Sequence, residues 1–132
     1  MNKKEAFKYF GIIQNNERWS WSGISEDGKI VALTIWTDQS KFENGKWHYS
    51  NFNKNNEIWI NSPGNKDRIK HIEYCIKNLD SKFRVIWVHP KKKGVFDETR
   101  DIKQINPLKE GFFKITKFDQ TTGEFEAEST RD

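Results

Sequence analysis

The sequence has few of the features on which disulfide-bonded or membrane-spanning proteins depend. Cys75 is the only cysteine among the 132 residues, which excludes a disulfide within them and is typical of a protein in a reducing cytosol. No apolar run approaches the ~18 residues that a membrane-spanning helix needs. The first residues also lack the apolar stretch and cleavage site of a signal peptide. We therefore expect a cytoplasmic protein without a membrane partner.

Motifs for metal binding and covalent catalysis are also missing. The three histidines, His48, His71 and His89, are far apart, and no Cys or His pair has the spacing of zinc ligands. Cys75 is one helical turn from His71, but its Ile neighbours indicate a buried position, where a thiol behaves as a small hydrophobe. There is no Gly-x-Ser-x-Gly nucleophile elbow and no glycine-rich phosphate loop. We expect no cofactor.

Aromatic residues compensate for a low aliphatic content. Hydrophobic residues make up 34% of the chain, but 6 Trp and 10 Phe help to bring the aromatic share to 14%. Each large ring buries much apolar area, so a few rings can complete a core in a chain of this length. The mean hydropathy is −0.94, yet charged residues are interspersed with periodic apolar positions, which favours a folded chain. We expect one domain, residues 1–132.

The positive charge is unevenly distributed. The chain has 23 basic and 19 acidic residues, and residues 65–93 contain nine basic against three acidic ones, a local charge of 9 − 3 = +6. The last fourteen residues contain one basic and five acidic residues, 1 − 5 = −4. A basic side on a mixed surface is what a nucleic-acid partner requires. Alternatively, the lysines form solvated faces of a chain that is rich in Lys and Asn throughout.

The clearest local pattern is a β-hairpin. Residues 18–24 and 29–38 are rich in β-branched and aromatic types, and the turn-forming residues 25–28 (Ser-Glu-Asp-Gly) separate them. The second of these strands is apolar on both faces, so we expect both faces to be covered.

The remaining elements complete the expected fold. We expect helices over residues 2–10 and 66–79, strands over 57–61, 82–89 and 100–105, and a final hairpin of 112–118 with 124–129. Asn65 is the expected N-cap of the second helix. Asn44-Gly45 predicts a turn between Phe42 and Trp47, within a second small hairpin or an aromatic loop. The whole predicts an α+β fold, a curved or barrel-like mixed sheet of about six strands with two flanking helices.

Tryptophans beside polar residues indicate a pocket for a planar base. Stacking on an aromatic ring stabilises a bound base by roughly 1–3 kcal/mol, and polar side chains nearby can hydrogen-bond to its edge. The candidates for base binding are Trp19, Ser20, Trp21, Ser22, Trp36, Asp38 and Trp59, and those for phosphate binding are Lys66, Arg68, Lys70, Lys91, Lys92 and Lys93. Alternatively, the tryptophans fill the core, and Asp38 caps a turn.

Two other functions stay open beside non-catalytic nucleic-acid binding. Asp101 and Lys103, with Asp97 and Glu98 just before them, are the residue types with which a metal-dependent nuclease holds its cation and orients water. A solvated turn in a highly charged chain explains the same residues. The third possibility is a protein-interaction module, in which the tryptophans belong to a core or an interface and the charge is incidental.

The order of elements resembles the small barrels of the PUA-like superfamily, which includes the base-reading SRA, YTH and EVE domains. Residues 19–23 (Trp-Ser-Trp-Ser-Gly), 35–38 (Ile-Trp-Thr-Asp) and 63–69 (Pro-Gly-Asn-Lys-Asp-Arg-Ile), with the closing Thr-Gly-Glu-Phe-Glu-Ala-Glu, also resemble bacterial domains found alone or ahead of HNH nuclease modules. The resemblance implies recognition of nucleic acid, with a modified base flipped into the barrel mouth, in a restriction or defence context beside a partner nuclease. It does not imply cleavage, because the chain has no His-Asn-His motif. We expect DNA rather than RNA as the partner.

Overall fold

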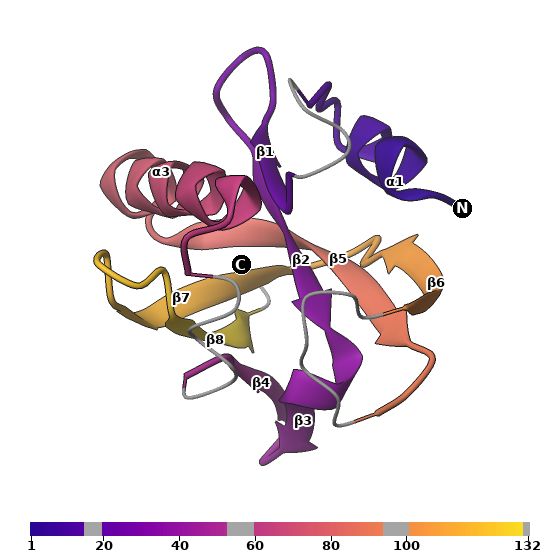
Figure 1. Ribbon diagram of the computed structural model, residues 1–132. Coiled ribbons are helices and arrows are strands. Elements are labelled where there is room, and N and C mark those ends of the chain that lie inside the picture. The colour runs from indigo at the N-terminus through magenta and orange to yellow at the C-terminus, as the bar shows by residue number, and fades with distance from the viewer. Residues whose placement is uncertain (15–19, 53–59, 94–100, 131–132) are drawn as a thin grey trace.

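The computed structural model describes residues 1–14, 20–52, 60–93 and 101–130, which form two α-helices, a short 3-10 helix and eight strands (Figure 1). The elements are α1 (Lys3–Tyr9), β1 (Ser22–Ile24), β2 (Val31–Trp36), η1 (Thr37–Gln39), β3 (Ser40–Glu43), β4 (Lys46–Ser50), α3 (Pro63–Asn78), β5 (Lys82–Pro90), β6 (Ile102–Pro107), β7 (Phe112–Phe118) and β8 (Phe125–Thr130). The sheet order is β1-β2-β5-β7-β8-β4-β3, with β6 also paired to β5. The α+β class, the mixed sheet and the two helices are confirmed. The sheet has more strands than predicted and, over the described residues, does not close into a barrel.

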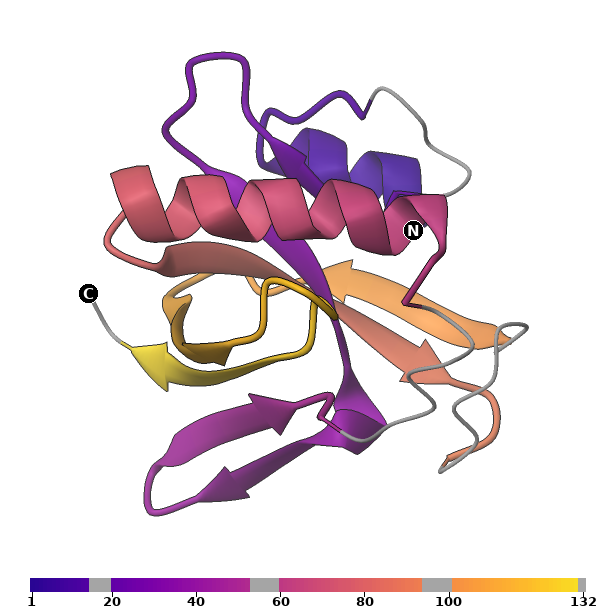
Figure 2. The ribbon, with the colours of Figure 1, turned by 60° about the vertical axis from the view of Figure 1, so that its left-hand side comes forward.

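β5 joins two parts of this sheet. It runs parallel to β2, with Leu33 opposite Val85. On its other edge, Lys82 and Phe83 pair with β7, whereas residues 86–90 pair with β6. β5 is therefore a member of both parts, and they diverge from it (Figure 2).

The predicted first hairpin is confirmed as β1 and β2. Its turn is closed by the Gly28 N–H, which donates to the Ser25 carbonyl over 2.9 Å. Gly28 has a φ of +73°, which glycine adopts without steric cost. The Tyr74 hydroxyl of α3 donates to the Gly28 carbonyl over 2.7 Å, so the tip of the hairpin is tied to this helix.

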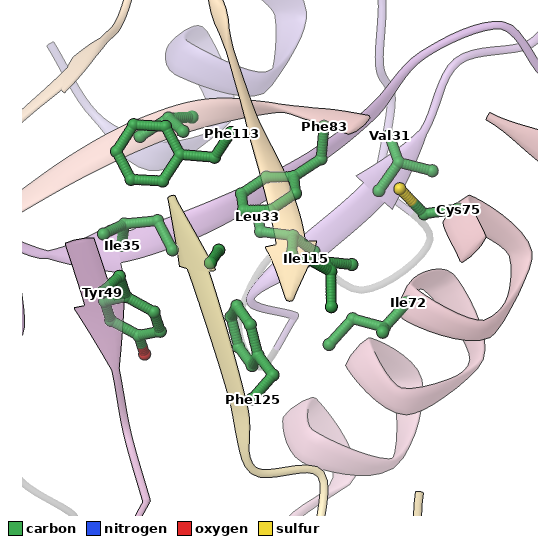
Figure 3. Close-up of a cluster of buried hydrophobic side chains, with 12 residues drawn as sticks. Val31, Leu33, Ile35, Tyr49, Ile72, Cys75, Phe83, Phe113, Ile115 and Phe125 are labelled. Atoms are coloured by element: carbon green, nitrogen blue, oxygen red, sulfur yellow. The ribbon is translucent and has the colours of Figure 1, made fainter. Parts of the chain in front are cut away.

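Both faces of β2 are covered, as its sequence predicts. Val31, Leu33 and Ile35 belong to the larger core, which lies between the curved sheet and α3 and is rich in phenylalanine (Figure 3). Ala32, on the opposite face, belongs to a second core with Phe7 of α1. The two cores are independent apolar clusters on either side of one strand, and burial of this apolar surface is the main term that stabilises the fold.

The second helix begins earlier than predicted. Its N-cap is Ser62, whose hydroxyl accepts from the Asn65 N–H, and Pro63 occupies the first turn, where its missing N–H costs nothing. Asn65 therefore lies inside the helix rather than at its cap. The buried face of α3 includes Ile72 and Cys75, as predicted for the thiol, whereas Ile76 is 42% exposed.

The other predicted elements have mixed outcomes. The second hairpin is confirmed as β3 and β4, around Asn44 and Gly45 with φ of +54° and +76°. β5, β6 and the final hairpin of β7 and β8 also agree with the sequence. Most of the predicted strand 57–61 lies outside the described residues, and Ile60 and Asn61 lie in a turn. In the described ranges, neither helix has the length and apolar character required to cross a membrane.

Candidate nucleic-acid interface

The structure brings several predicted base-binding residues together with the predicted phosphate-binding helix. Ser22 begins β1, which packs against α3, and Ser20 and Trp21 directly precede this strand. The Ser20 hydroxyl donates to Asp67 Oδ2 over 2.5 Å, and Ser22 Oγ lies 2.6 Å from His71 Nδ1. Both serines are buried, and their hydroxyl groups already contact Asp67 and His71. They are therefore not part of the surface that a ligand contacts.

Arg68 is enclosed beneath this junction. It is 5% exposed, and its guanidinium carbon lies 5.0 Å from the centroid of Trp21 and 5.4 Å from that of Phe125. Its Nη2 donates to Asn65 Oδ1 over 3.0 Å, and burial lowers the pKa of the Arg68 guanidinium. A phosphate cannot reach a side chain packed in this way. We therefore assign Arg68 to holding Trp21 in place rather than to phosphate binding.

Asn65 connects the start of α3 to the turn between β7 and β8. Its Nδ2 donates to the carbonyls of Ile60 and Thr122, over 2.9 and 2.8 Å, while its Oδ1 accepts from Arg68. The side chain is fully buried. Asn65 and Arg68 thus form a polar network that fixes the helix end relative to Trp21 and the sheet.

The serine, histidine and aspartate of the junction do not form a catalytic triad. His71 Nε2 lies 3.9 Å from Asp67 Oδ1, which is too far for a hydrogen bond, and Ser22 is 0% exposed. A nucleophile must reach its substrate, and the hydroxyl of Ser22 cannot. Burial lowers the pKa of His71, an effect that Asp67 only partly opposes. We interpret this group as a packing network that joins β1 to α3.

The exposed cations of α3 form one stripe. Lys66, Lys70 and Lys77 are exposed and recur at helical spacing, so they share the outer side of the helix, together with Glu73. Trp21 lies half-buried beside this helix. The α3 stripe, defined as Lys66, Lys70 and Lys77, therefore provides exposed cations on the side of the helix opposite Arg68, whose guanidinium packs over Trp21.

The other predicted cations lie elsewhere. Lys91, Lys92 and Lys93 are exposed and follow the C-terminal end of β5, away from α3 in Figures 1 and 2. They are not part of the α3 stripe, so the predicted phosphate-binding lysines do not form one continuous surface.

The remaining predicted base-binding residues fall into two groups, those placed on other elements and those outside the described residues. Trp36 is partly buried against the second core, and Asp38 lies in η1. Trp19 and Trp59 lie outside the described residues. Of the predicted base-binding residues, Trp21 is the one that the described structure leaves half-buried against a side chain of α3, that of Arg68.

The nuclease candidates are only partly described. Asp101 and Lys103 are exposed at the start of β6, whereas Asp97 and Glu98 lie outside the described ranges. Among the residues that the structure covers, no group of three or more His, Cys, Asp or Glu side chains is arranged to hold a metal ion.

An aromatic cluster that the base-binding prediction missed lies at the second hairpin. Phe42 and Trp47, opposite each other in β3 and β4, have ring centroids 5.4 Å apart, and Trp47 lies 5.3 Å from Trp87 of β5. Phe42 is 59% exposed and Trp47 37%. We call Phe42, Trp47 and Trp87 the hairpin aromatic cluster. The Asn44-Gly45 signal predicts the Phe42–Trp47 pair, but its approach to Trp87 depends on contacts between distant strands.

A groove of about 610 Å³ lies along the same hairpin. Its lining residues come from η1, β3, β4, β7 and β8 and from the chain just after β4: Asp38, Gln39, Ser40, Lys41, Glu43, His48, Tyr49, Ser50, Phe52, Thr116, Glu126, Ala127 and Glu128. Four carboxylates and one lysine give this acidic groove a formal charge of 1 − 4 = −3. Lys114 and Lys117 of β7 lie opposite Glu128 and Glu126 and reduce this negative charge.

The two ends of the molecule therefore differ in charge. α3 presents its lysines on one side of the sheet, and β3 and β4 carry the acidic groove at the opposite end (Figure 2). Comparison of the chain with protein-family models, curated proteins and solved structures finds no match. Function must therefore be inferred from the residues at these two ends.

Proposed function

We propose that this protein is a non-catalytic nucleic-acid-binding domain whose contact surface is the α3 stripe with Trp21. The observation that carries the proposal is the packing of Trp21 against α3, with Arg68 over its ring at 5.0 Å and exposed Lys66 and Lys70 on the same helix. Nucleic acid needs cations for its phosphates and aromatic faces for unstacked bases. α3 supplies the cations, and the chain that leads into β1 beside it supplies the aromatic ring.

The two kinds of residue have different roles in the proposal. The lysines bind phosphates and position the strand without reading its sequence. Trp21, held by Arg68, stacks on a base or a modified base. The resemblance to bacterial domains found alone or ahead of HNH nuclease modules supports this assignment, because residues 19–23 and 63–69 belong to the motifs that carry it. The proposed ligand is DNA, and the proposed setting is a restriction or defence system with a partner nuclease.

A binding assay with a charge-matched control tests the proposal. Labelled DNA and RNA oligonucleotides, single- and double-stranded, with and without modified bases, are titrated with the full chain while anisotropy is measured. We expect binding that weakens with salt. Replacing the three lysines of the α3 stripe by alanine should reduce the slope of log K against log[salt] by about 2–3 and weaken binding roughly tenfold or more.

The control replaces three exposed lysines outside α3, Lys103, Lys109 and Lys114, by alanine and has the same net charge. It should retain most of the affinity. Equal losses in both triple variants would show that net charge alone attracts the ligand, and absence of binding at low salt would refute the proposal. Cleavage that requires a divalent cation and is abolished by Asp101→Ala would favour the nuclease instead.

A further inference from the structure

The sheet has an open edge at β3. This strand is the last in the sheet order, and within the described residues its pairing partner is β4, on one side. It lies at the end of the molecule away from α3 (Figure 2). The outer side of an edge strand carries backbone groups that its own sheet does not pair, so it can pair with a strand of another chain.

The backbone of Phe42 is directed toward this open edge. Its partner in β4 is Trp47, whose N–H donates to the Ser129 hydroxyl of β8 over 2.9 Å and therefore points away from β3. In an antiparallel ladder, the two residues of a pair exchange both backbone hydrogen bonds or neither. Phe42 and Trp47 are therefore a non-hydrogen-bonded pair, and the N–H and C=O of Phe42 lie on the outer side of β3.

The residues on either side of Phe42 have opposite charges. Lys41 and Glu43 are two residues apart and share one face of the strand. Their side chains are 70% and 55% exposed and lie 3.4 Å apart. An ion pair this exposed is weak, so both groups remain available to a further partner.

This charge pattern is complementary to itself in one register. When two copies of β3 pair antiparallel with Phe42 at the centre, Lys41 of each copy lies opposite Glu43 of the other. Moving the centre by one residue places Lys41 opposite Lys41, or Glu43 opposite Glu43. Opposite charges across a strand pair stabilise it, and like charges destabilise it. The strand is therefore matched to a second copy of itself.

We propose that β3 pairs with β3 of a second copy, antiparallel and centred on Phe42, to form a symmetric dimer. The N–H of each Phe42 donates to the Phe42 carbonyl of the other copy, as the two-fold symmetry requires. The Phe42 rings, 59% exposed in the single chain, then lie opposite each other beside Trp47. The interface is separate from the α3 stripe, so the proposal does not depend on nucleic-acid binding.

Sedimentation equilibrium of the full chain tests whether it associates. One short strand pair buries little surface and gives a weak dimer, so we expect the mass to increase from 15.7 kDa toward twice that value between about 10 μM and 1 mM. A constant mass of 15.7 kDa over this range would overturn the proposal.

Charge reversal tests the register. Lys41→Glu and Glu43→Lys each place like charges opposite each other in a dimer of identical copies, and each should weaken association about tenfold or more. An equimolar mixture of the two variants should associate again, because both pairs across the interface then have opposite charges. The double variant should associate as well as the unaltered chain. Lys109→Glu, an exposed change outside β3 with the same effect on net charge as Lys41→Glu, is the control and should retain the dimer.

A backbone variant tests the pairing itself. Phe42→Pro removes the outward N–H, which the ladder with β4 does not use, and should abolish the dimer. Circular dichroism checks its fold, and the exposed charge variants carry the test if proline prevents folding. Undiminished association of both single charge variants, or a mixture of them that stays monomeric, would show that the copies do not meet at β3 in this register.

Discussion

Gly123 shows how closely single residues are fitted around the buried Asn65. Its φ is +83°, and a Cβ at this position would collide with the Asn65 amide. Gly45 has a similar φ of +76° but nothing within 4 Å of such a Cβ. Both glycines therefore have a positive φ that disfavours other residues, but only Gly123 also lacks space for a side chain.

Alanine at each position separates the two effects. Gly45→Ala should lower the free energy of unfolding by about 1 kcal/mol, the cost of an alanine in the left-handed region. Gly123→Ala should cost at least about 1 kcal/mol more, because it also displaces buried hydrogen bonds of Asn65. Chemical denaturation measures both. Equal losses would mean that the Asn65 network shifts without cost.

Cys75 should be unreactive in the folded protein. Its Sγ is buried beside the Lys82 carbonyl at 3.1 Å, and burial raises the pKa of this thiol to about 12. Since the thiolate is the reactive form, Ellman's reagent should modify Cys75 only after denaturation. Rapid modification of the native protein, without loss of structure, would contradict the buried position.

At the scale of elements, the contact between β1 and α3 should make stability depend on pH. Burial lowers the pKa of His71, so the unfolded chain, in which a histidine has its usual pKa near about 6.5, takes up the proton first as pH falls. The contribution of His71 to stability is therefore complete above that pH and is lost as pH decreases toward the lower pKa of the folded state.

We expect the free energy of unfolding to decrease between about pH 7 and pH 5.5, and His71→Asn to reduce this slope. Denaturant titrations at several pH values measure it. His48→Asn, which changes a histidine of the β3–β4 hairpin, is the control and should retain the dependence. If His71→Asn leaves the slope unchanged, another group causes it.

The start of α3 explains why its boundary could not be predicted correctly. Ser62, Pro63 and Gly64 are typical turn residues, and Asn65 is a favourable N-cap, so the sequence favours a late start. The same Ser62 and Pro63 also suit the cap and first turn of a helix. A tertiary contact favours the earlier start, since the Asn65 side chain inside the helix donates to the Thr122 carbonyl in the turn between β7 and β8. Its amide also bonds to Ile60 and Arg68 nearby in the chain.

At the scale of the molecule, the sequence predicted patterns that repeat locally and missed those that depend on distant strands. The two faces of β2 and the final hairpin follow from side-chain alternation. β3 has no such pattern, because most of its residues are exposed. The position of β4 beside β8, with Tyr49 opposite Ala127, joins segments far apart in the chain, and it creates the acidic groove that no local motif indicates.

For the candidate site, the sequence predicted the residue types but not the direction of every side chain. Composition indicated lysines on α3 and a tryptophan on the first hairpin, and the structure places Trp21 beside that helix. It could not indicate that Arg68 points inward, because an arginine between lysines has the sequence pattern of a surface residue. The inward position depends on the rings of Trp21 and Phe125, which come from opposite ends of the chain.

The shared strand β5 has a consequence for how the protein unfolds. Both parts of the sheet depend on its backbone for pairing, through β2, β6 and β7, so neither part can detach while the other remains complete. Amide hydrogens in the middle of β5 should accordingly exchange with solvent only when the whole molecule opens. A cut at this strand would yield two fragments that each lack a structural partner.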